Sequence, residues 1–155
     1  MKRVRPLTTI VVVVAMLIGS AIWWMFFRGP SSSDCAPVRD LLSFNKTQIE
    51  RLNAKTHVPE PGSYGSETTP SELDYRDWSD GLADRASKVS APDLAGPARD
   101  MAQTADRLVQ ARLDYDAQAA RTAPGAAAPA TAMVVAAFND QFEQQVKALL
   151  QTCPL

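Results

Sequence analysis

Residues 7–27 read LTTIVVVVAMLIGSAIWWMFF and contain no charged side chain. At the helical rise of about 1.5 Å per residue, a segment of this length spans roughly 31 Å, which matches the hydrocarbon core of a bilayer. We therefore expect residues 7–27 to form a transmembrane helix. Residues 1–6 then form a short stub on one side of the membrane, and everything after the helix lies on the other side.

The flanking charges predict the direction of this helix. Lys2, Arg3 and Arg5 precede the segment, and only Arg28 follows it closely. Basic residues are retained on the cytoplasmic side of a membrane, so the N-terminus is expected to be cytoplasmic. The sequence thus predicts a single-pass protein of the cell membrane whose C-terminal part is extracytoplasmic.

Cleavage of this segment as a signal peptide is the competing interpretation. Small residues at Gly19, Ser20 and Ala21 follow the hydrophobic run and suit a cleavage site. A cut there would leave a chain that begins with six large apolar residues from Ile22, which soluble proteins avoid. A lipoprotein anchor at Cys35 is disfavoured because the acidic Asp34 stands directly before it.

The rest of the chain divides into a tether, residues 28–33, and one domain, residues 34–155. This domain is long enough for one hydrophobic core but not for two. When the four basic residues up to position 28 are set aside, 12 basic residues remain against 17 acidic ones, a formal charge near −5. This charge excludes the basic surface that binding to nucleic acid or to anionic lipid requires.

Cys35 and Cys153 are the two cysteines of the chain, and they bracket this domain. Outside the cytoplasm an isolated pair of this kind is typical of a structural disulfide. The spacing excludes a CxxC redox motif, and two thiols are too few for a metal site. Closing a loop of this length would stabilise the fold by about 4–5 kcal/mol in the chain-entropy model.

Two amphipathic helices are expected before residue 90. The first begins at Asp34, a good N-cap, and ends between Lys55 and His57. The second begins at Ser71, which forms a near capping box with Asp74. In both helices apolar residues recur at spacings of three and four. The first face consists of Val38, Leu41, Leu42, Asn45 (a polar interruption), Ile49 and Leu52, and the second of Tyr75, Trp78, Leu82, Ala86 and Val89.

Two further helices are expected after residue 90. The third begins between Pro92 and Pro97 and carries a heptad-like seam, which suits packing within a bundle better than a self-associating coiled coil. The fourth covers residues 131–152. The third seam consists of Leu94, Ala98, Met101, Ala105, Leu108, Arg112, Tyr115 and Ala119, widened by Val109 and Leu113. The fourth face consists of Val134, Val135, Phe138, Phe142, Val146, Leu149 and Cys153.

Two connections lack any helical pattern. Residues 57–70 are rich in proline and glycine and form either a solvated crossover or a functional loop. Residues 122–130 form a Pro/Gly/Ala linker. Four helices joined in this way predict an all-α fold, an antiparallel four-helix bundle. In such a bundle Cys35 and Cys153 lie at the same end, so one disulfide closes it.

The sequence contains few of the residue patterns that catalysis requires. His57 is the only histidine, and no GxSxG turn places a nucleophilic serine near it. The four aspartates of the second helix, Asp74, Asp77, Asp80 and Asp84, resemble a solvated face more than a general acid and base pair. We therefore expect a protein that is not an enzyme, with no catalytic residues, no metal site and no cofactor.

Two binding functions remain open, of which the sequence favours the first. The first is an accessory or protein-interaction subunit of a cell-envelope assembly, with an envelope protein as partner and the bilayer bound through residues 7–27. The second is a carrier or sensor of a small apolar ligand such as a lipid or haem, for which His57 and Tyr64 would be the iron ligands. A pocket lined by Trp78, Phe138 and Phe142 would favour the carrier, and a filled core with an exposed apolar patch would favour the interaction subunit.

The layout as a whole resembles small single-pass membrane proteins of mycobacteria and related actinobacteria. The resemblance is carried by the stub KRVR at residues 2–5, the Val/Ile-rich anchor, the two outer cysteines and the Ala/Arg/Asp-rich helices. Arginine outnumbers lysine by eleven to five, which fits a GC-rich genome. The resemblance implies a cell-envelope location and no particular functional residue.

Overall fold

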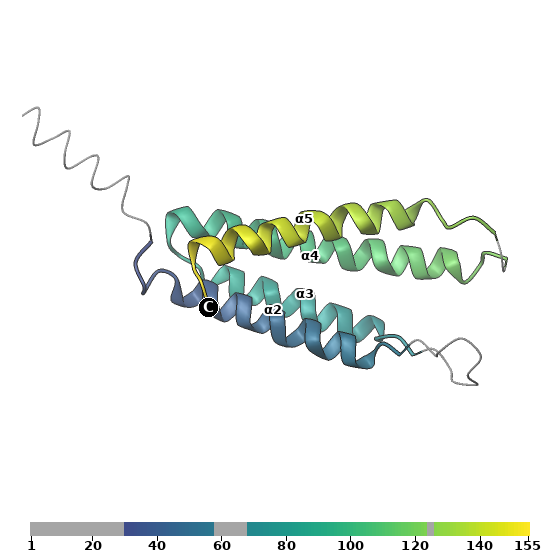
Figure 1. Cartoon of the computed structure of the whole chain (residues 1–155), viewed down its shortest axis with the longest axis horizontal. Coiled ribbons are helices and arrows are strands. Elements are labelled where there is room, and N and C mark those ends of the chain that lie inside the picture. The colour runs from purple at the N-terminus through teal and green to yellow at the C-terminus, as the bar shows by residue number, and fades with distance from the viewer. Residues whose placement is uncertain (1–29, 58–67, 124–125) are drawn as a thin grey trace, which may run out of the picture.

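The computed structural model describes residues 30–57, 68–123 and 126–155. Four helices occupy these ranges: α2 (Ala36–Lys55), α3 (Glu72–Ser87), α4 (Pro92–Ala119) and α5 (Thr131–Thr152). Successive helices run in alternating directions along one long axis (Figure 1). The prediction of an all-α four-helix bundle is confirmed for this part of the chain.

The stub at residues 1–6 and the transmembrane helix expected at residues 7–27 lie outside the described residues, as does most of the loop at residues 57–70. None of the helices in the described ranges combines the length and the apolarity that a membrane crossing demands. At the two ends of the loop, His57 and Thr68 exchange backbone hydrogen bonds of 2.9 and 3.0 Å. The chain therefore leaves α2 and returns to α3 at one point of the bundle.

The predicted disulfide joins Cys35 to Cys153 across 118 positions of sequence, with their Cα atoms 5.3 Å apart. Both cysteines are buried. Next to them, Arg39 Nε donates a 3.0 Å hydrogen bond to the carbonyl oxygen of Pro154. The start of α2 and the end of α5 are thus held together at one end of the bundle, which we call the disulfide end; the opposite end is the loop end (Figure 1).

The predicted capping box of α3 is present, but the cap predicted for α2 is wrong. Ser71 Oγ accepts from the Asp74 amide at 3.2 Å, and Asp74 Oδ2 accepts from the Ser71 amide at 2.9 Å. Asp34 instead accepts from the amide and the hydroxyl of Ser31, and Cys35 takes the N-cap position of α2 without a side-chain cap. The reason is Pro37, because its nitrogen has no hydrogen to donate to Asp34 three residues earlier.

The core occupies the half of the bundle near the disulfide end. It combines the first part of α2, the second part of α3, the first part of α4 and the last part of α5. The largest fully buried side chains are Val38, Leu41, Leu82, Met101, Leu149 and Cys153.

Toward the loop end, the neighbouring helices only partly cover the predicted apolar faces. This corrects the buried faces predicted for α4 and α5. In α5, Val134 is 45% exposed, and Val135 and Phe138 are half-buried. In α4, Arg112 and Tyr115 of the predicted seam are also half-buried. The cause is that α2 lies too far from α5 to cover them, although each helix packs against its neighbour in sequence.

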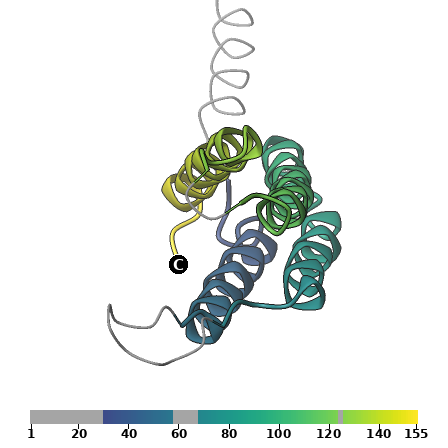
Figure 2. The same cartoon turned by 90° about the vertical axis from the view of Figure 1, so that its right-hand side faces the viewer.

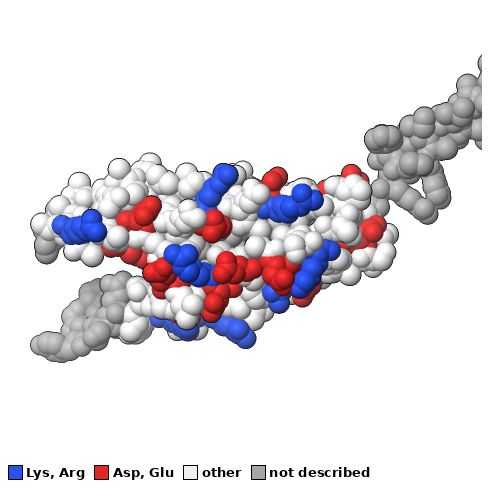
Figure 3. Space-filling view, turned by 180° about the vertical axis from the view of Figure 1, so that it is seen from behind, with Lys and Arg blue, Asp and Glu red and all other residues white. Residues whose placement is uncertain are grey.

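The face formed by α3 and α4 is highly charged. Lysine and arginine alternate with aspartate and glutamate along it (Figure 3). Asp77, Asp80 and Asp84 of α3 are all exposed, as predicted for a solvated face. On the opposite side of the bundle, α2 and α5 face each other (Figure 2).

Candidate functional site

The candidate site is a groove between α2 and α5. Viewed from the loop end, α2 and α5 lie on one side of the bundle, and α3 and α4 lie on the other (Figure 2). The other three helix pairs pack along their lengths, whereas α2 and α5 make few contacts with each other. A four-helix bundle with one unclosed seam has a groove along that seam.

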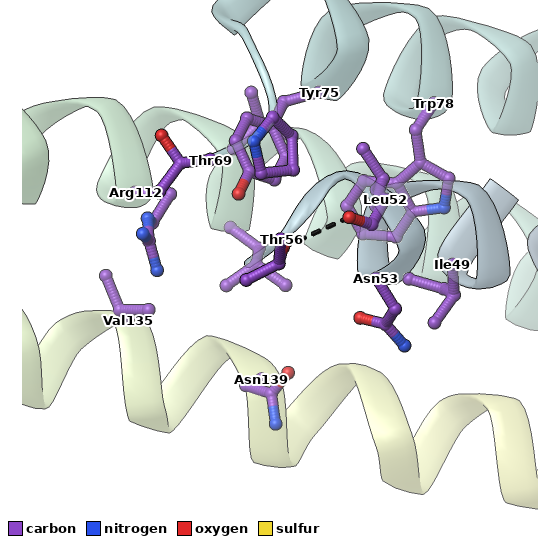
Figure 4. A pocket seen from close by; sticks show the side chains of 13 residues that line it. Ile49, Leu52, Asn53, Thr56, Thr69, Tyr75, Trp78, Arg112, Val135 and Asn139 are labelled. Carbon is purple, nitrogen blue, oxygen red and sulfur yellow. Dashed lines mark hydrogen bonds between the residues drawn. The ribbon is translucent and has the colours of Figure 1, made fainter. Parts of the chain in front are cut away.

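The groove widens near the loop end into a cavity of about 350 Å³, a size within the range of small-molecule sites. All four helices contribute to this loop-end cavity (Figure 4). Its lining is mixed, with polar side chains around an apolar floor. The lining residues are Ile49, Leu52, Asn53, Thr56, Thr69, Pro70, Tyr75, Trp78, Leu108, Val109, Arg112, Val135 and Asn139.

Trp78 and Asn45 build the floor. The Trp78 indole Nε1 donates a buried 3.0 Å hydrogen bond to Asn45 Oδ1, which ties α3 to α2. The indole also meets the Phe142 ring edge to face, with centroids 5.3 Å apart. These contacts hold the indole in place. They also give a hydrogen-bond partner to Asn45, the polar residue that interrupts the apolar face of α2.

Residues at helical spacing form the two walls. On α2, Ile49, Asn53 and Thr56 follow one another at spacings of four and three and therefore share a face. On α5, Val135 and Asn139 stand opposite them (Figure 4). The two asparagines extend toward each other from the two walls, and Asn139 Nδ2 donates to Glu143 Oε1 at 2.9 Å. Polar amides thus line both walls of the groove.

Arg112 is the one basic side chain that lines the loop-end cavity within the described residues. It extends from α4 toward Val135 of α5 (Figure 4). Its Nε is hydrogen-bonded to Asp116 at 3.2 Å, and its side chain is 36% exposed. Nearby, burial raises the pKa of Tyr75, and the positive charge of Arg112 partly offsets this rise. The phenol therefore stays neutral at physiological pH.

The groove continues from the cavity toward the disulfide end as a narrower, mainly apolar stretch of about 340 Å³, which we call the apolar strip. Ile49 and Asn139 line both the cavity and the strip, so the two are continuous. The strip is lined by Asn45, Ile49, Asn139, Phe142, Glu143, Val146, Lys147 and Leu150.

The groove has the composition of a binding site. The described lining of the loop-end cavity includes neither a histidine nor a carboxylate. His57 is exposed outside it, and Tyr64 lies outside the described residues. Among the described residues no group of three or more His, Cys, Asp or Glu side chains is placed to hold a metal ion. The residues that line the cavity favour apolar contact and hydrogen bonding.

The structure brings together part of the pocket considered from sequence. Trp78 and Phe142 meet, but Phe138 is half-buried and does not line the groove. Sequence analysis missed the polar walls at Asn53 and Asn139. The available signal was the presence of polar residues on apolar faces, at Asn45 in α2 and at Arg112 in α4.

Comparison of the chain with protein-family models, with curated proteins and with solved structures gives no match.

Proposed function

We propose that the protein is a membrane-anchored, extracytoplasmic binding module that holds a small, largely apolar ligand in the α2–α5 groove and has no enzymatic activity. The observation that carries this proposal is the groove that is left because α2 and α5 make few contacts with each other. An apolar floor with a few polar groups around it is the usual composition of a small-molecule site. Of the two functions that the sequence leaves open, we therefore favour the carrier of a small ligand over the interaction subunit.

The residues at the groove do not support haem as the ligand. Haem iron needs an axial ligand such as histidine, cysteine, methionine or tyrosine. Both cysteines are in the disulfide, and His57 is outside the cavity. Tyr75 is the one side chain of this set in the described lining, and its raised pKa disfavours the phenolate that would bind iron. A lipid-like ligand suits the groove better.

The location in the cell envelope rests on sequence. Residues 7–27 supply the proposed membrane anchor, and the resemblance to small actinobacterial membrane proteins agrees with it. The chain reaches Cys35 of the disulfide directly before α2, the first helix of the bundle, begins at Ala36. An anchor at residues 7–27 would therefore place the disulfide end of the bundle next to the membrane.

An accessory role with a protein partner is the second candidate. It is favoured by Met133 and Val134 of α5, which are 77% and 45% exposed. Adjacent apolar side chains on an outer helix face are typical of a contact with another protein. The two functions are compatible, because these side chains are absent from the lining of the groove.

Native mass spectrometry of the full-length protein, purified in mild detergent from its own membrane, tests the proposal. We expect the wild-type protein to retain a small molecule. Ile49→Trp fills the point where the cavity meets the apolar strip and should abolish this retention. Gln103→Trp adds the same side chain to the charged α3–α4 face and should preserve it.

Two results would contradict the proposal. Retention of the same molecule by Ile49→Trp would show that the groove is not the site. A wild-type protein without a small molecule, but with a second protein bound in stoichiometric amount, would replace the carrier with the interaction subunit.

A further inference from the structure

The two ends of the α2–α5 groove differ in chemistry. The loop-end cavity carries Arg112 together with the amides of Asn53 and Asn139. The apolar strip that leads away from it exposes mainly the hydrocarbon of Ile49, Phe142, Val146 and Leu150. Glu143 and Lys147, one charge of each sign, also border it. A ligand that complements both ends has a polar head and a long apolar tail.

Arg112 favours an acidic head. A guanidinium has five N–H donors in a planar fork, and Asp116 accepts only from Nε in this structure. The side chain extends across the groove toward Val135, so its outer end faces the cavity (Figure 4). Carboxylates match this fork by forming paired hydrogen bonds with it.

The dimensions favour a single tail. From Val135 to Leu150, α5 borders the groove over roughly 22 Å. This length suits an extended alkyl chain of about eighteen carbons, because each C–C bond of roughly 1.5 Å advances the zigzag chain by about 1.25 Å. The cavity and the strip measure about 350 and 340 Å³. These volumes are at the low end for ligand sites, which disfavours a lipid with two acyl chains or a helix of another protein.

We propose that the α2–α5 groove binds a long-chain carboxylic acid, with the carboxylate on Arg112 and the hydrocarbon tail along the apolar strip toward the disulfide end. This inference rests on the proposed function, since it names the class of ligand for the same groove. With the anchor at residues 7–27, the tail points toward the membrane and the head away from it. A fatty acid in a bilayer leaflet has the same orientation, so transfer between the leaflet and the groove needs no reversal of the molecule.

Trp78 provides the readout, because it is the only tryptophan outside the expected anchor. The experiment uses the full-length chain with Trp23→Phe and Trp24→Phe, held in amphipol, so that all tryptophan fluorescence comes from the floor of the groove. The probes are dibromostearic acid, which carries two bromines at mid-chain, and its methyl ester. Bromine quenches tryptophan only at short range, and the ester has the same tail without the charge.

Two arginine variants of the same helix separate head recognition from general effects of charge. Arg112→Gln removes the cation from the cavity, and Arg107→Gln removes an exposed one from the α3–α4 face. We expect the acid to quench Trp78 and Arg112→Gln to weaken its affinity about tenfold, the range for loss of a hydrogen bond to a charged group. The ester should bind more weakly and be insensitive to Arg112→Gln, and Arg107→Gln should change neither probe. Circular dichroism checks that each variant is folded.

The outcomes distinguish the two proposals. Equal quenching by acid and ester, with no effect of Arg112→Gln, would overturn recognition of the carboxylate but leave the groove as a binding site. No quenching of Trp78 by either probe in the folded protein would overturn the long-chain ligand. If native mass spectrometry then showed a different small molecule that Ile49→Trp removes, the proposed function would stand without this inference.

Discussion

The seam between α3 and α4 and the seam between α2 and α5 contrast within one bundle. Ala86 and Ala102 are buried on α3 and α4, and side chains of this size allow two helices to approach closely, although an open surface hollow of about 570 Å³ lies beside them. The facing positions of α2 and α5 instead carry Asn53 and Asn139. Burying unpaired amides is costly, so we infer that these two side chains disfavour closure of the seam. The comparison indicates that the choice between small apolar and polar side chains determines which seam of a bundle closes.

The seam between α2 and α3 is closed in a similar way to the seam between α3 and α4. Phe44 of α2 lies directly over Gly81 of α3, so closely that a Cβ at position 81 would collide with its ring. Arg85 of α3 stacks on the same ring, with its guanidinium carbon 3.8 Å from the ring centroid. Here a missing side chain, rather than a small one, brings the two helices together.

The largest effect is expected from the disulfide, because it joins residues 118 positions apart and so removes much of the conformational freedom of the unfolded chain. Changing both Cys35 and Cys153 to alanine should lower the free energy of unfolding of residues 30–155 by about 4–5 kcal/mol. Urea denaturation followed by circular dichroism measures this change. A loss below about 1 kcal/mol would mean that α2 and α5 are held together by contacts other than the bridge.

The next effect concerns the floor of the groove. Asn45→Leu removes the acceptor of the buried Trp78 N–H and should cost about 1–3 kcal/mol, the penalty for an unsatisfied buried donor. Adding Trp78→Phe to this variant removes the donor too, so a double-mutant cycle in urea should show that the two changes are strongly non-additive. Additive losses would indicate that the hydrogen bond contributes nothing to the floor.

A smaller effect, a gain in stability, is expected when the asparagines that line the α2–α5 groove are replaced. Replacing Asn53 and Asn139 by leucine gives the open seam an apolar lining and should stabilise the domain by about 1 kcal/mol as α2 and α5 close, while ligand retention falls. Gln103→Leu on the α3–α4 face is the control and should change stability by no more than about 0.5 kcal/mol. Unchanged stability in the double variant would show that the amides do not hold the seam open.

The smallest effect is a pH dependence at the loop end. The hydrogen bond from Lys55, followed by those from Ser71, lowers the pKa of Asp74 from 3.8 to about 2. A carboxyl whose pKa is lower in the folded state adds stability above pH 3.8, and this stability is lost as the pH falls toward 2. Thermal unfolding between pH 5 and pH 2 should show a steeper loss for wild type than for Asp74→Asn. Asp80→Asn, which removes an exposed carboxylate of α3, should keep the wild-type slope.

Local sequence signals predict the helices well. The fourth helix was expected at residues 131–152 and α5 has these bounds, and the Ser71 capping box marks the start of α3 as expected. The disulfide was predictable because an up-and-down bundle brings its two termini to one end. The α2 cap was missed because Pro37 was judged only as a residue that the first turn of a helix tolerates. An Asp34 cap would also need the N–H that Pro37 lacks.

The groove was harder to predict because it depends on packing between helices far apart in the sequence. The apolar period of α5 is regular, and nothing in it shows that Val135 and Phe138 stay half-buried. That outcome depends on the distance from α2, which is a tertiary property. The polar residues on apolar faces, Asn45 and Arg112, were visible in the sequence, but which partner each would meet was not.

The central claim is that the α2–α5 groove is the binding surface, and an NMR titration tests it most directly. The sample is ¹⁵N-labelled residues 30–155, produced in an oxidising compartment, and the ligand is laurate, a soluble long-chain carboxylate. We predict that amide signals shift along residues 49–55 of α2 and 135–150 of α5, and that residues 83–87 of α3, which face away from the groove, stay unchanged. Shifts centred on the charged α3–α4 face, or no shifts at a saturating concentration of laurate, would contradict the claim.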